Sequence, residues 1–262
     1  ILDTAVYADL VILAVGESDH RTGENNCVAD LRLPAGQEEL IRALSGLGKP
    51  LVLIVFAGRP LVLTDVIRHT DAILYAWHPG NMGAHAVADI LFGQVNPSGR
   101  LPVTFLRHTG QVPFHYNAKS TGRWVSEYHD LPSRPLFPFG FGLSYTTFEY
   151  TDLELPSEVV FGQPVQVALT VRNTGSRPGE AVVQCYIQDC VSRTTRPVRE
   201  LKGFQRVALQ PGESRQVKFR LGLDELSYYG PGGRWVCDPG DFKVWVGADS
   251  TATLEGSFKM TG

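Results

Sequence analysis

ADLVILAVGESDHRTGENNCVADLRLPAGQEELIRALSGLGKPLVLIVFAG, residues 8–58, is the stretch that decides the fold of this chain. It opens on a short apolar run that ends in Gly16, which is typical of a buried strand. Residues 36–48 repeat leucine and isoleucine at helical spacing, and residues 49–58 form a second apolar run. A strand, a helix and a strand in this order predict a βαβ unit in a parallel sheet.

The same alternation continues to about residue 105. Residues 59–70 predict a short helix with Pro60 at its first position, and residues 81–93 predict a helix capped by Asn81. A third apolar run, which predicts a third strand, lies between them. We therefore expect residues 1–105 to form a partial three-layer α/β sandwich with a mostly parallel sheet, incomplete at its N-terminal side.

The rest of the chain changes texture twice. Residues 106–145 are rich in glycine, proline and aromatic residues, which predicts an ordered connector whose aromatics pack onto a domain surface. From 146 to 262 apolar residues alternate with polar ones, as in Val165, Val167 and Leu169, and turn sequences separate the runs. This pattern predicts an antiparallel β-sandwich of the fibronectin type III-like kind.

The composition excludes several classes of protein. Hydrophobic residues make up 43% of the 262 residues and charged residues 19%, so the chain can bury cores and is not disordered. The net charge is -3 without a basic cluster, which argues against nucleic-acid binding. No apolar run approaches the roughly 20 residues of a membrane span.

The four cysteines lack the spacing of a zinc site. Cys185 lies in step with Val183 and Ile187, which predicts a buried thiol. A Cys185–Cys190 or Cys190–Cys237 disulfide stays open if the protein is exported.

The loop of residues 16–34 concentrates ionisable side chains. It spans 19 residues where such loops usually take about 2 to 6, and it follows the carboxyl end of a strand, where ligands bind in βαβ sheets. Its charged candidates are Glu17, Asp19, His20, Arg21 and Glu24.

The loop is compatible with several chemistries. A metal site would use Glu17, Asp19, His20 and Glu24, but their spacing matches no characteristic metal motif. A Ser-His-Asp arrangement with Ser18 lacks GxSxG, and the phosphate-binding motifs GxGxxG and GxxxxGK are absent after the strand. A solvated loop without function and a single carboxylate acting as general acid both remain, and composition does not choose between them.

Seven stretches together resemble glycoside hydrolase family 3, in particular its bacterial β-glucosidases and β-xylosidases. They are ADLVILAVGESDHRTGENNCVADLRLPAGQEELIRAL, GKPLVLIVFAGRPLVL, WHPGNMGAHAVADILFGQVNPSGRLPVTF, PLFPFGFGLSYTTFEY, NTGSRPGEAVVQCYI, RPVRELKGFQRVALQPGES and DPGDFKVWVG. They occur in the family's order and cover nearly the whole chain.

The resemblance implies a retaining, exo-acting β-glycosidase, first of all a β-glucosidase, acting on β-linked oligosaccharides or on aryl or alkyl glycosides. It places the acid/base on Glu24, in the "TGE" that matches the family's "SGE"-like motif. The nucleophile would be an Asp on a (β/α)8 barrel, which we expect on another polypeptide because this chain opens in mid-domain. No cofactor or metal is needed, and a periplasmic or secreted location is favoured over a cytoplasmic one.

Further expectations concern residues near Glu24. The resemblance allows Asp19, His20 and Arg21 to contact the leaving-group sugar, although solvated loop residues are the alternative. Glu17 is a candidate supporting residue, and His78 is expected to be structural. The family commonly has an arginine just after this loop, where this chain has Cys27-Val28, and its loss predicts a less rigid loop.

Trp124 and Tyr128 could stack on sugar at a rim, but packing between domains is the safer interpretation. The alternatives for function are a β-xylosidase or N-acetyl-β-glucosaminidase of the same family, and a non-catalytic carbohydrate-binding or scaffold module. Glu24 and the two later domains count against the N-acetylglucosaminidase.

Overall fold

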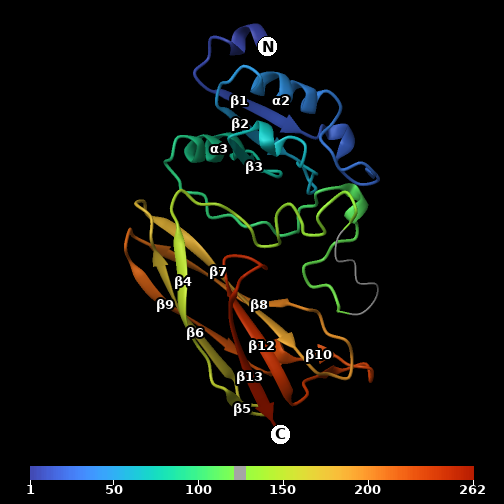
Figure 1. Ribbon diagram of the computed structural model, residues 1–262, viewed down its shortest axis with the longest axis vertical. Coiled ribbons are helices and arrows are strands. Elements are labelled where there is room, and N and C mark those ends of the chain that lie inside the picture. Colours follow the sequence, from blue (N-terminus) through green and yellow to red (C-terminus); the bar gives the residue numbers. More distant parts are fainter. Residues whose placement is uncertain (121–127) are drawn as a thin grey trace. The chain divides into compact units, whose positions relative to one another are not determined.

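The computed structural model describes residues 1–120 and 128–262 (Figure 1). Within that part, one compact unit holds residues 1–95, 104–114 and 128–137, and a second holds residues 96–103, 115–120 and 138–262. The segment expected to be a connector therefore contributes to both units, and the boundaries expected at 105/106 and 145/146 stay a proposal.

The first unit is built on the parallel sheet that the sequence predicts. The order is β1-β2-β3, with Val11 opposite Leu51 and Val52 opposite Ala72. Ile41 and Leu44 bury the apolar face of α2. The bounds are α1 Leu2–Ala5, β1 Val11–Gly16, η1 Asp19–Arg21, α2 Gln37–Ser45, β2 Leu51–Phe56, η2 Ile67–His69, β3 Ala72–Tyr75, α3 Gly83–Leu91 and η3 Thr109–Gln111.

Both predicted helix starts after β2 are wrong. No α-helix begins at Pro60, because Leu61, Val62 and Leu63 are all buried in an extended segment, and Val62 donates to the Leu31 carbonyl at 2.8 Å. Only the 3-10 turn η2 follows. Asn81 does not cap α3.

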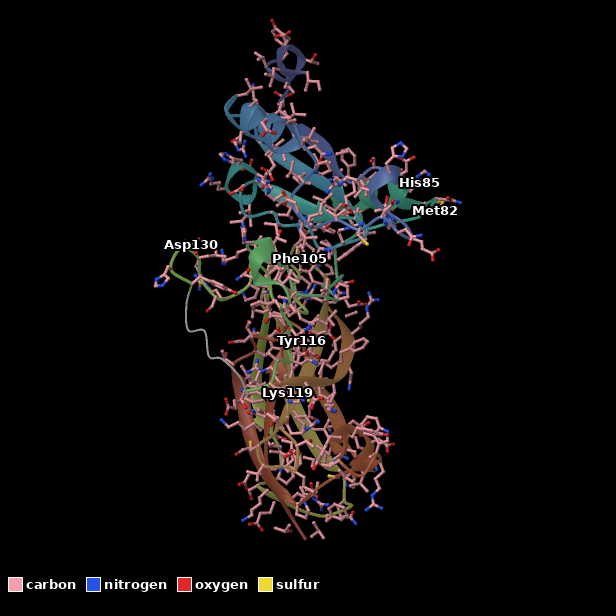
Figure 2. All side chains as sticks on the ribbon, turned by 90° about the vertical axis from the view of Figure 1, so that its right-hand side faces the viewer. Met82, His85, Phe105, Tyr116, Lys119 and Asp130 are labelled. Atoms are coloured by element: carbon pink, nitrogen blue, oxygen red, sulfur yellow. The ribbon has the colours of Figure 1, made fainter. Side chains whose placement is uncertain are left out.

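The helix α3 begins after Met82, which makes no side-chain cap hydrogen bond. Met82, 67% exposed, directly precedes this helix, and the exposed His85 lies in its first turn (Figure 2).

The strand β1 is less buried than its apolar run predicts. Ile12 is 45% exposed and Ala14 is also exposed, whereas Val15 and Gly16 are buried. Within the part of the chain that the structure describes, the strand lies at an edge of the sheet, and its alternating burial means that one face is covered and the other is not. A continuous apolar run does not distinguish this half-covered strand from one buried on both faces.

Gly16 ends β1 at a point where no side chain fits. Its φ is +134°, and a Cβ built on it would lie 1.9 Å from the Phe56 carbonyl oxygen of β2. Gln37, the first residue of α2, accepts from Gly16 N at 2.8 Å and donates to Gly16 O at 2.9 Å. The two ends of the long loop are thus joined at its base.

Gly16→Ala should lower the free energy of unfolding by about 3 kcal/mol or more, because backbone atoms of two strands would have to separate. Gly48→Ala is the matched control: its φ is +66° but a Cβ there meets nothing within 4 Å, so we expect a loss of about 1 kcal/mol. Urea denaturation measures both. Equal losses would contradict the steric account.

The second unit is a β-sandwich with one large and one small sheet. Their orders, within the described residues, are β5-β13-β12-β7-β8 and β4-β6-β9, and β10 pairs with β11 separately. The bounds are β4 Phe148–Glu154, β5 Glu158–Val160, β6 Val165–Asn173, β7 Gly179–Asp189, β8 Glu200–Leu209, β9 Ser214–Leu221, α4 Leu223–Leu226, β10 Tyr228–Tyr229, β11 Trp235–Val236, β12 Gly240–Gly247 and β13 Leu254–Thr261.

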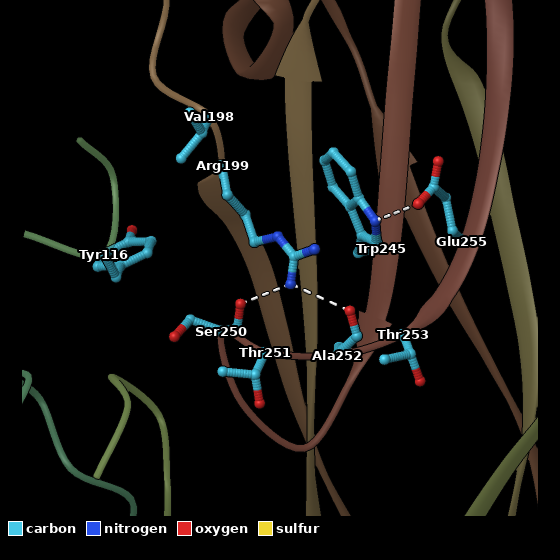
Figure 3. Close-up of a pocket in the computed structure, with 9 residues that line it drawn as sticks. All are labelled: Tyr116, Val198, Arg199, Trp245, Ser250, Thr251, Ala252, Thr253 and Glu255. Carbon is cyan, nitrogen blue, oxygen red and sulfur yellow. Dashed lines mark hydrogen bonds between the residues drawn. The ribbon is translucent and has the colours of Figure 1, made fainter. Parts of the chain in front are cut away.

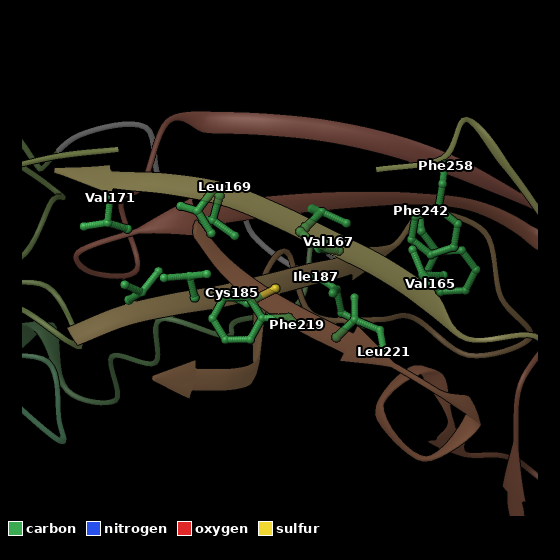
Figure 4. Packing of buried hydrophobic residues seen from close by; sticks show 14 of the residues in the cluster. Val165, Val167, Leu169, Val171, Cys185, Ile187, Phe219, Leu221, Phe242 and Phe258 are labelled. Atoms are coloured by element: carbon green, nitrogen blue, oxygen red, sulfur yellow. The ribbon is translucent and has the colours of Figure 1, made fainter. Parts of the chain in front are cut away.

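The core of this sandwich follows the two-residue period of the sequence. Figure 4 shows Val165, Val167, Leu169 and Val171 of β6 facing Cys185 and Ile187 of β7, with the rings of Phe242 and Phe258 at one end. Those two rings stack with centroids 4.9 Å apart. Every second residue of β6 is buried, and β7 is buried continuously from Ala181 to Ile187, so the two strands share one core and the predicted sandwich is confirmed.

The aromatics of the connector pack within the unit to which each segment belongs. In the first unit the ring centroids of Phe105 and Phe137 lie 6.3 Å apart. In the second, Tyr116 stacks on Phe139 at 4.2 Å and meets Tyr186 edge-on at 5.9 Å. Tyr116, Phe137 and Phe139, within the described part of 106–145, are therefore used for packing.

All four cysteines are free thiols. Cys185 is fully buried, as predicted, and burial raises the pKa of its thiol to about 12. Cys27 and Cys190 are exposed, and desolvation also raises the pKa of Cys190.

Iodoacetamide at pH 8 should therefore alkylate Cys27 first and Cys190 more slowly in the folded protein, and should leave Cys185 unmodified. Peptide mass spectrometry gives the order, and urea-unfolded protein is the control in which all four thiols react. Modification of Cys185 at the rate of Cys27 under native conditions would show that the core is open.

Candidate active-site loop

The long loop lies at the carboxyl edge of the parallel sheet. Gly16 pairs with Phe56 and Val55 with Tyr75, so the ends of all three strands meet at one edge. Residues 17–36 leave from this edge and return to it at α2. Ligands bind at such edges, which makes this loop the candidate site.

Glu17 is a buried carboxylate at the root of the loop. Its side chain is 0% exposed, with Oε2 3.2 Å from Arg59 Nε and Oε1 3.6 Å from Arg21 Nε. Neither carboxylate oxygen has a partner in hydrogen-bonding geometry. The two guanidinium groups therefore compensate its charge by ion pairing, which a carboxylate removed from water requires.

Arg59 also holds the backbone on both sides of Glu24. Its Nη2 donates to the Arg21 carbonyl at 2.7 Å and to the Asn26 carbonyl at 3.2 Å. The carbonyl of Arg59 itself accepts from the Tyr75 hydroxyl at 2.5 Å. Glu17, Arg21, Asn26, Arg59 and Tyr75 form what we call the Arg59 cluster.

The turn between the Arg21 and Asn26 carbonyls has its own hydrogen bonds. Thr22 Oγ1 donates to the Ser18 carbonyl at 3.0 Å, and Asn26 Nδ2 donates to the Thr22 carbonyl at 2.7 Å. Gly23 and Asn25 have φ of +113° and +66°, conformations that suit glycine and asparagine. The short turn is thus well determined by local contacts.

Glu24 lies in the middle of this turn and is exposed. Within residues 1–120 and 128–262 its carboxyl has no hydrogen bond and no ion pair. A carboxyl on a braced turn, without a competing partner, can accept or donate a proton to a group brought to it.

Asp19, His20 and Arg21 form the 3-10 turn η1 beside it. His20 Nε2 lies 3.6 Å from Asp19 Oδ1, and both side chains are highly exposed. Arg21 instead directs its Nε to Glu17, which gives it a structural contact. The predicted sugar contacts of all three stay predictions.

His78 follows β3 at the same edge of the sheet. It is exposed, and its ring lies over Gly58, where an added Cβ would meet His78 Nε2 at 2.7 Å and Thr22 Cγ2 at 3.6 Å. This position beside the turn fits a structural histidine. Tyr128 is 41% exposed, and Trp124 lies outside the described residues.

The sequence did not point to Arg59 or Tyr75. Arg59 is 35 positions from Glu24, and its neighbour Pro60 suggested a helix start. The available signal was its place: it follows a parallel strand directly, at the edge where the candidate loop lies.

The described residues hold no group of three or more His, Cys, Asp or Glu side chains placed to bind a metal ion. None of their helices is long and apolar enough to span a bilayer.

A pocket of about 470 Å³ lies in the second unit and takes no residue from the loop (Figure 3). Arg199 extends into it, donates through Nη1 to the Ser250 and Ala252 carbonyls, and lies 4.2 Å from the Trp245 ring centroid. Trp245 Nε1 in turn donates to Glu255 at 2.8 Å. These groups hold the β12–β13 turn and leave no pair of free carboxyls for catalysis.

Two stretches of the chain match known domain families. Residues 2–145 match the glycosyl hydrolase family 3 C-terminal domain, and residues 181–250 match a fibronectin type III-like domain. A periplasmic beta-glucosidase of Salmonella typhimurium is 40% identical over 99% of this chain, and a beta-xylosidase of Formosa agariphila is 39% identical over 96%. Each match takes up 35% of the relative, so the chain spans about a third of the length of these proteins.

Solved structures match over the same extent. The beta-glucosidase from Listeria innocua in complex with glucose superposes with a TM-score of 0.95 at 38% identity, covering all of this chain and 38% of that one. A b-glucosidase from Erythrobacter marinus gives 0.95 at 39% identity over 99% of this chain and 35% of its own.

Proposed function

This chain belongs to glycosyl hydrolase family 3, and from that premise we propose that it supplies the general acid/base of a retaining, exo-acting β-glycosidase. The observation that carries the assignment is the placement of Glu24. Its carboxyl is exposed and unpaired within the described residues, on a turn whose two flanking carbonyls Arg59 holds. Asp19 is also exposed on this loop, but it already accepts from His20 N.

The chemistry that we propose needs two carboxyl groups. Glu24 donates its proton to the glycosidic oxygen while a second carboxylate attacks the anomeric carbon and the aglycone leaves. Glu24, now ionised, then takes a proton from the water that releases the sugar. In a retaining enzyme the two carboxyls lie about 5 to 5.5 Å apart.

We propose that the second carboxylate is an Asp on a (β/α)8 barrel outside these 262 residues. The matched relatives extend well beyond the third that this chain covers, which leaves room for such a domain. The Asp nucleophile and its sugar-binding pocket would thus come from the barrel, and Glu24 would reach it from the loop.

A β-glucoside is the substrate that we propose, as a β-linked oligosaccharide or an aryl or alkyl glycoside. The support is the name beta-glucosidase on the Salmonella relative and on the Listeria structure with glucose. The β-xyloside is the second candidate, since a beta-xylosidase is 39% identical. The periplasmic relative supports an exported location.

Glu24→Gln in the full-length enzyme should lower hydrolysis of cellobiose by about 100- to 10,000-fold, because an alkoxide leaves poorly without a proton. The single-turnover glycosylation rate with 2,4-dinitrophenyl β-glucoside should change by less than about tenfold, since that aglycone needs no protonation. Glu39→Gln, an exposed carboxyl on α2, is the matched control and should leave both rates unchanged. An equal loss with both substrates would remove Glu24 from the acid/base role.

Glu24→Ala should also be rescued by azide. Without the base, a glycosyl-enzyme formed from an activated substrate is hydrolysed slowly, because the attacking water is not deprotonated. Azide needs no deprotonation and attacks the glycosyl-enzyme in place of water. We expect β-glucosyl azide by mass spectrometry and NMR. No rescue at an azide concentration that leaves the wild-type rate intact would contradict the proposal.

A further inference from the structure

We propose that Arg59 is the positioning residue that fixes the Glu24 carboxyl for proton transfer. The inference rests on the proposed role of Glu24 and adds a residue 35 positions away that, within the described residues, makes no hydrogen bond or ion pair with the Glu24 side chain. Its basis is one guanidinium that meets the Glu24 loop at three points: the Glu17 carboxylate, the Arg21 carbonyl and the Asn26 carbonyl.

Tyr75 holds the backbone of Arg59 in place. Its carbonyl accepts from the Tyr75 hydroxyl at 2.5 Å, and that hydroxyl accepts from Leu61 N at 3.2 Å. Tyr75 belongs to β3, and its ring packs on Trp77 and Phe105 with centroids 4.8 and 4.9 Å away. The backbone of Arg59 is therefore tied to the sheet and its aromatic layer.

The buried Glu17 carboxylate attracts the Arg59 side chain into the interior. Glu17 follows β1 directly, its amide donates to the Phe56 carbonyl at 2.9 Å, and its carboxylate is fully buried. The side chain of Arg59 is 21% exposed and places Nε 3.2 Å from Glu17 Oε2. A buried carboxylate and a largely buried guanidinium hold each other, because either alone would be costly to desolvate.

The shape of the guanidinium lets Arg59 contact the carboxylate and the turn together. Nε faces the carboxylate while Nη2 donates to two carbonyls, and the residues between those carbonyls, 22–25, carry Glu24. A planar guanidinium can form the ion pair with the carboxylate and donate to both carbonyls at once, whereas an ammonium on a flexible stem is a single point charge. Lysine at position 59 would keep the charge beside Glu17 and lose the hold on the turn.

Loss of the Arg59 contacts should impair only the substrates whose aglycone must be protonated. A displacement of about 1 Å in a catalytic group can cost about 100-fold in rate, so a loosened turn should impair proton transfer. Substrates whose aglycone needs no proton should be insensitive to it. A residue that only stabilises the fold would instead affect both kinds of substrate equally.

The test compares Arg59→Lys with Glu24→Gln and the double variant in the full-length enzyme. Arg59→Lys should slow cellobiose hydrolysis by about 10- to 100-fold, chiefly in kcat, and change glycosylation by 2,4-dinitrophenyl β-glucoside less than about threefold. Added to Glu24→Gln, it should cause no further loss, because it acts only through Glu24. Arg42→Lys, which pairs with Glu38 on α2 at 3.1 Å, is the matched control and should leave both rates unchanged.

Tyr75→Phe is the second variant, because it loosens the Arg59 backbone without altering charge. It should give the same dependence on leaving group, with a smaller loss, and it keeps the proposal testable if Arg59→Lys does not fold. Equal losses for both substrates, losses that add to those of Glu24→Gln, or no loss in either variant would overturn the positioning role.

The two proposals fail in different ways. If Glu24→Gln shows no dependence on leaving group and Glu24→Ala no azide rescue, the acid/base assignment is wrong and the role of Arg59 is overturned with it. If Glu24 behaves as assigned while Arg59→Lys and Tyr75→Phe do not, only the positioning role is overturned.

Discussion

The buried charge of Glu17 is the constraint on which the structure of the candidate loop depends. Glu17 is fully buried, and the groups that neutralise it are Arg21 from its own loop and Arg59 from the end of the neighbouring strand. Burial of an unpaired carboxylate would be prohibitive, so the fold must bring these side chains together. The long loop acquires a definite path as a result.

The base of the same loop is closed by a second set of contacts. Gln37 pairs with both backbone groups of Gly16, and the absence of a side chain at Gly16 lets β1 approach the Phe56 carbonyl. The loop is therefore held at its base by an amide and nearer its tip by a guanidinium. What stays accessible is the turn that carries Glu24, together with Asp19 and His20.

The periodic features of the sequence predicted the architecture well. The βαβ unit followed from residues 8–58, and the sandwich core followed from alternation in β6 because this strand buries every second residue. The burial of β1 and the helix at Pro60 could not be predicted this way. An apolar run has the same sequence whether one or both faces of its sheet are covered by other elements. Pro60 is compatible with a helix start and with an extended segment, and Leu61 to Leu63 are buried in the latter.

The candidate loop was located from its length, charge and place after a strand, whereas its support was not. Cys27 and Val28 stand where the resemblance expects an arginine, which predicted a looser loop. The looser loop stays a prediction, and the contact that sequence analysis missed is the hydrogen bond from Arg59 to the Asn26 carbonyl beside these residues. Contacts between residues distant in sequence depend on how strand ends are placed in space, and no local pattern records that placement.

The most direct measurement is a crystal structure of the full-length enzyme with a non-hydrolysable β-glucoside bound, such as one with sulfur in place of the glycosidic oxygen. We predict the Glu24 carboxyl about 3 Å from the sulfur and about 5 to 5.5 Å from the carboxylate beneath the anomeric carbon. Arg59 should keep its contacts with Glu17 and the Asn26 carbonyl. A different carboxyl group at the glycosidic position, with Glu24 turned to solvent, would contradict the account.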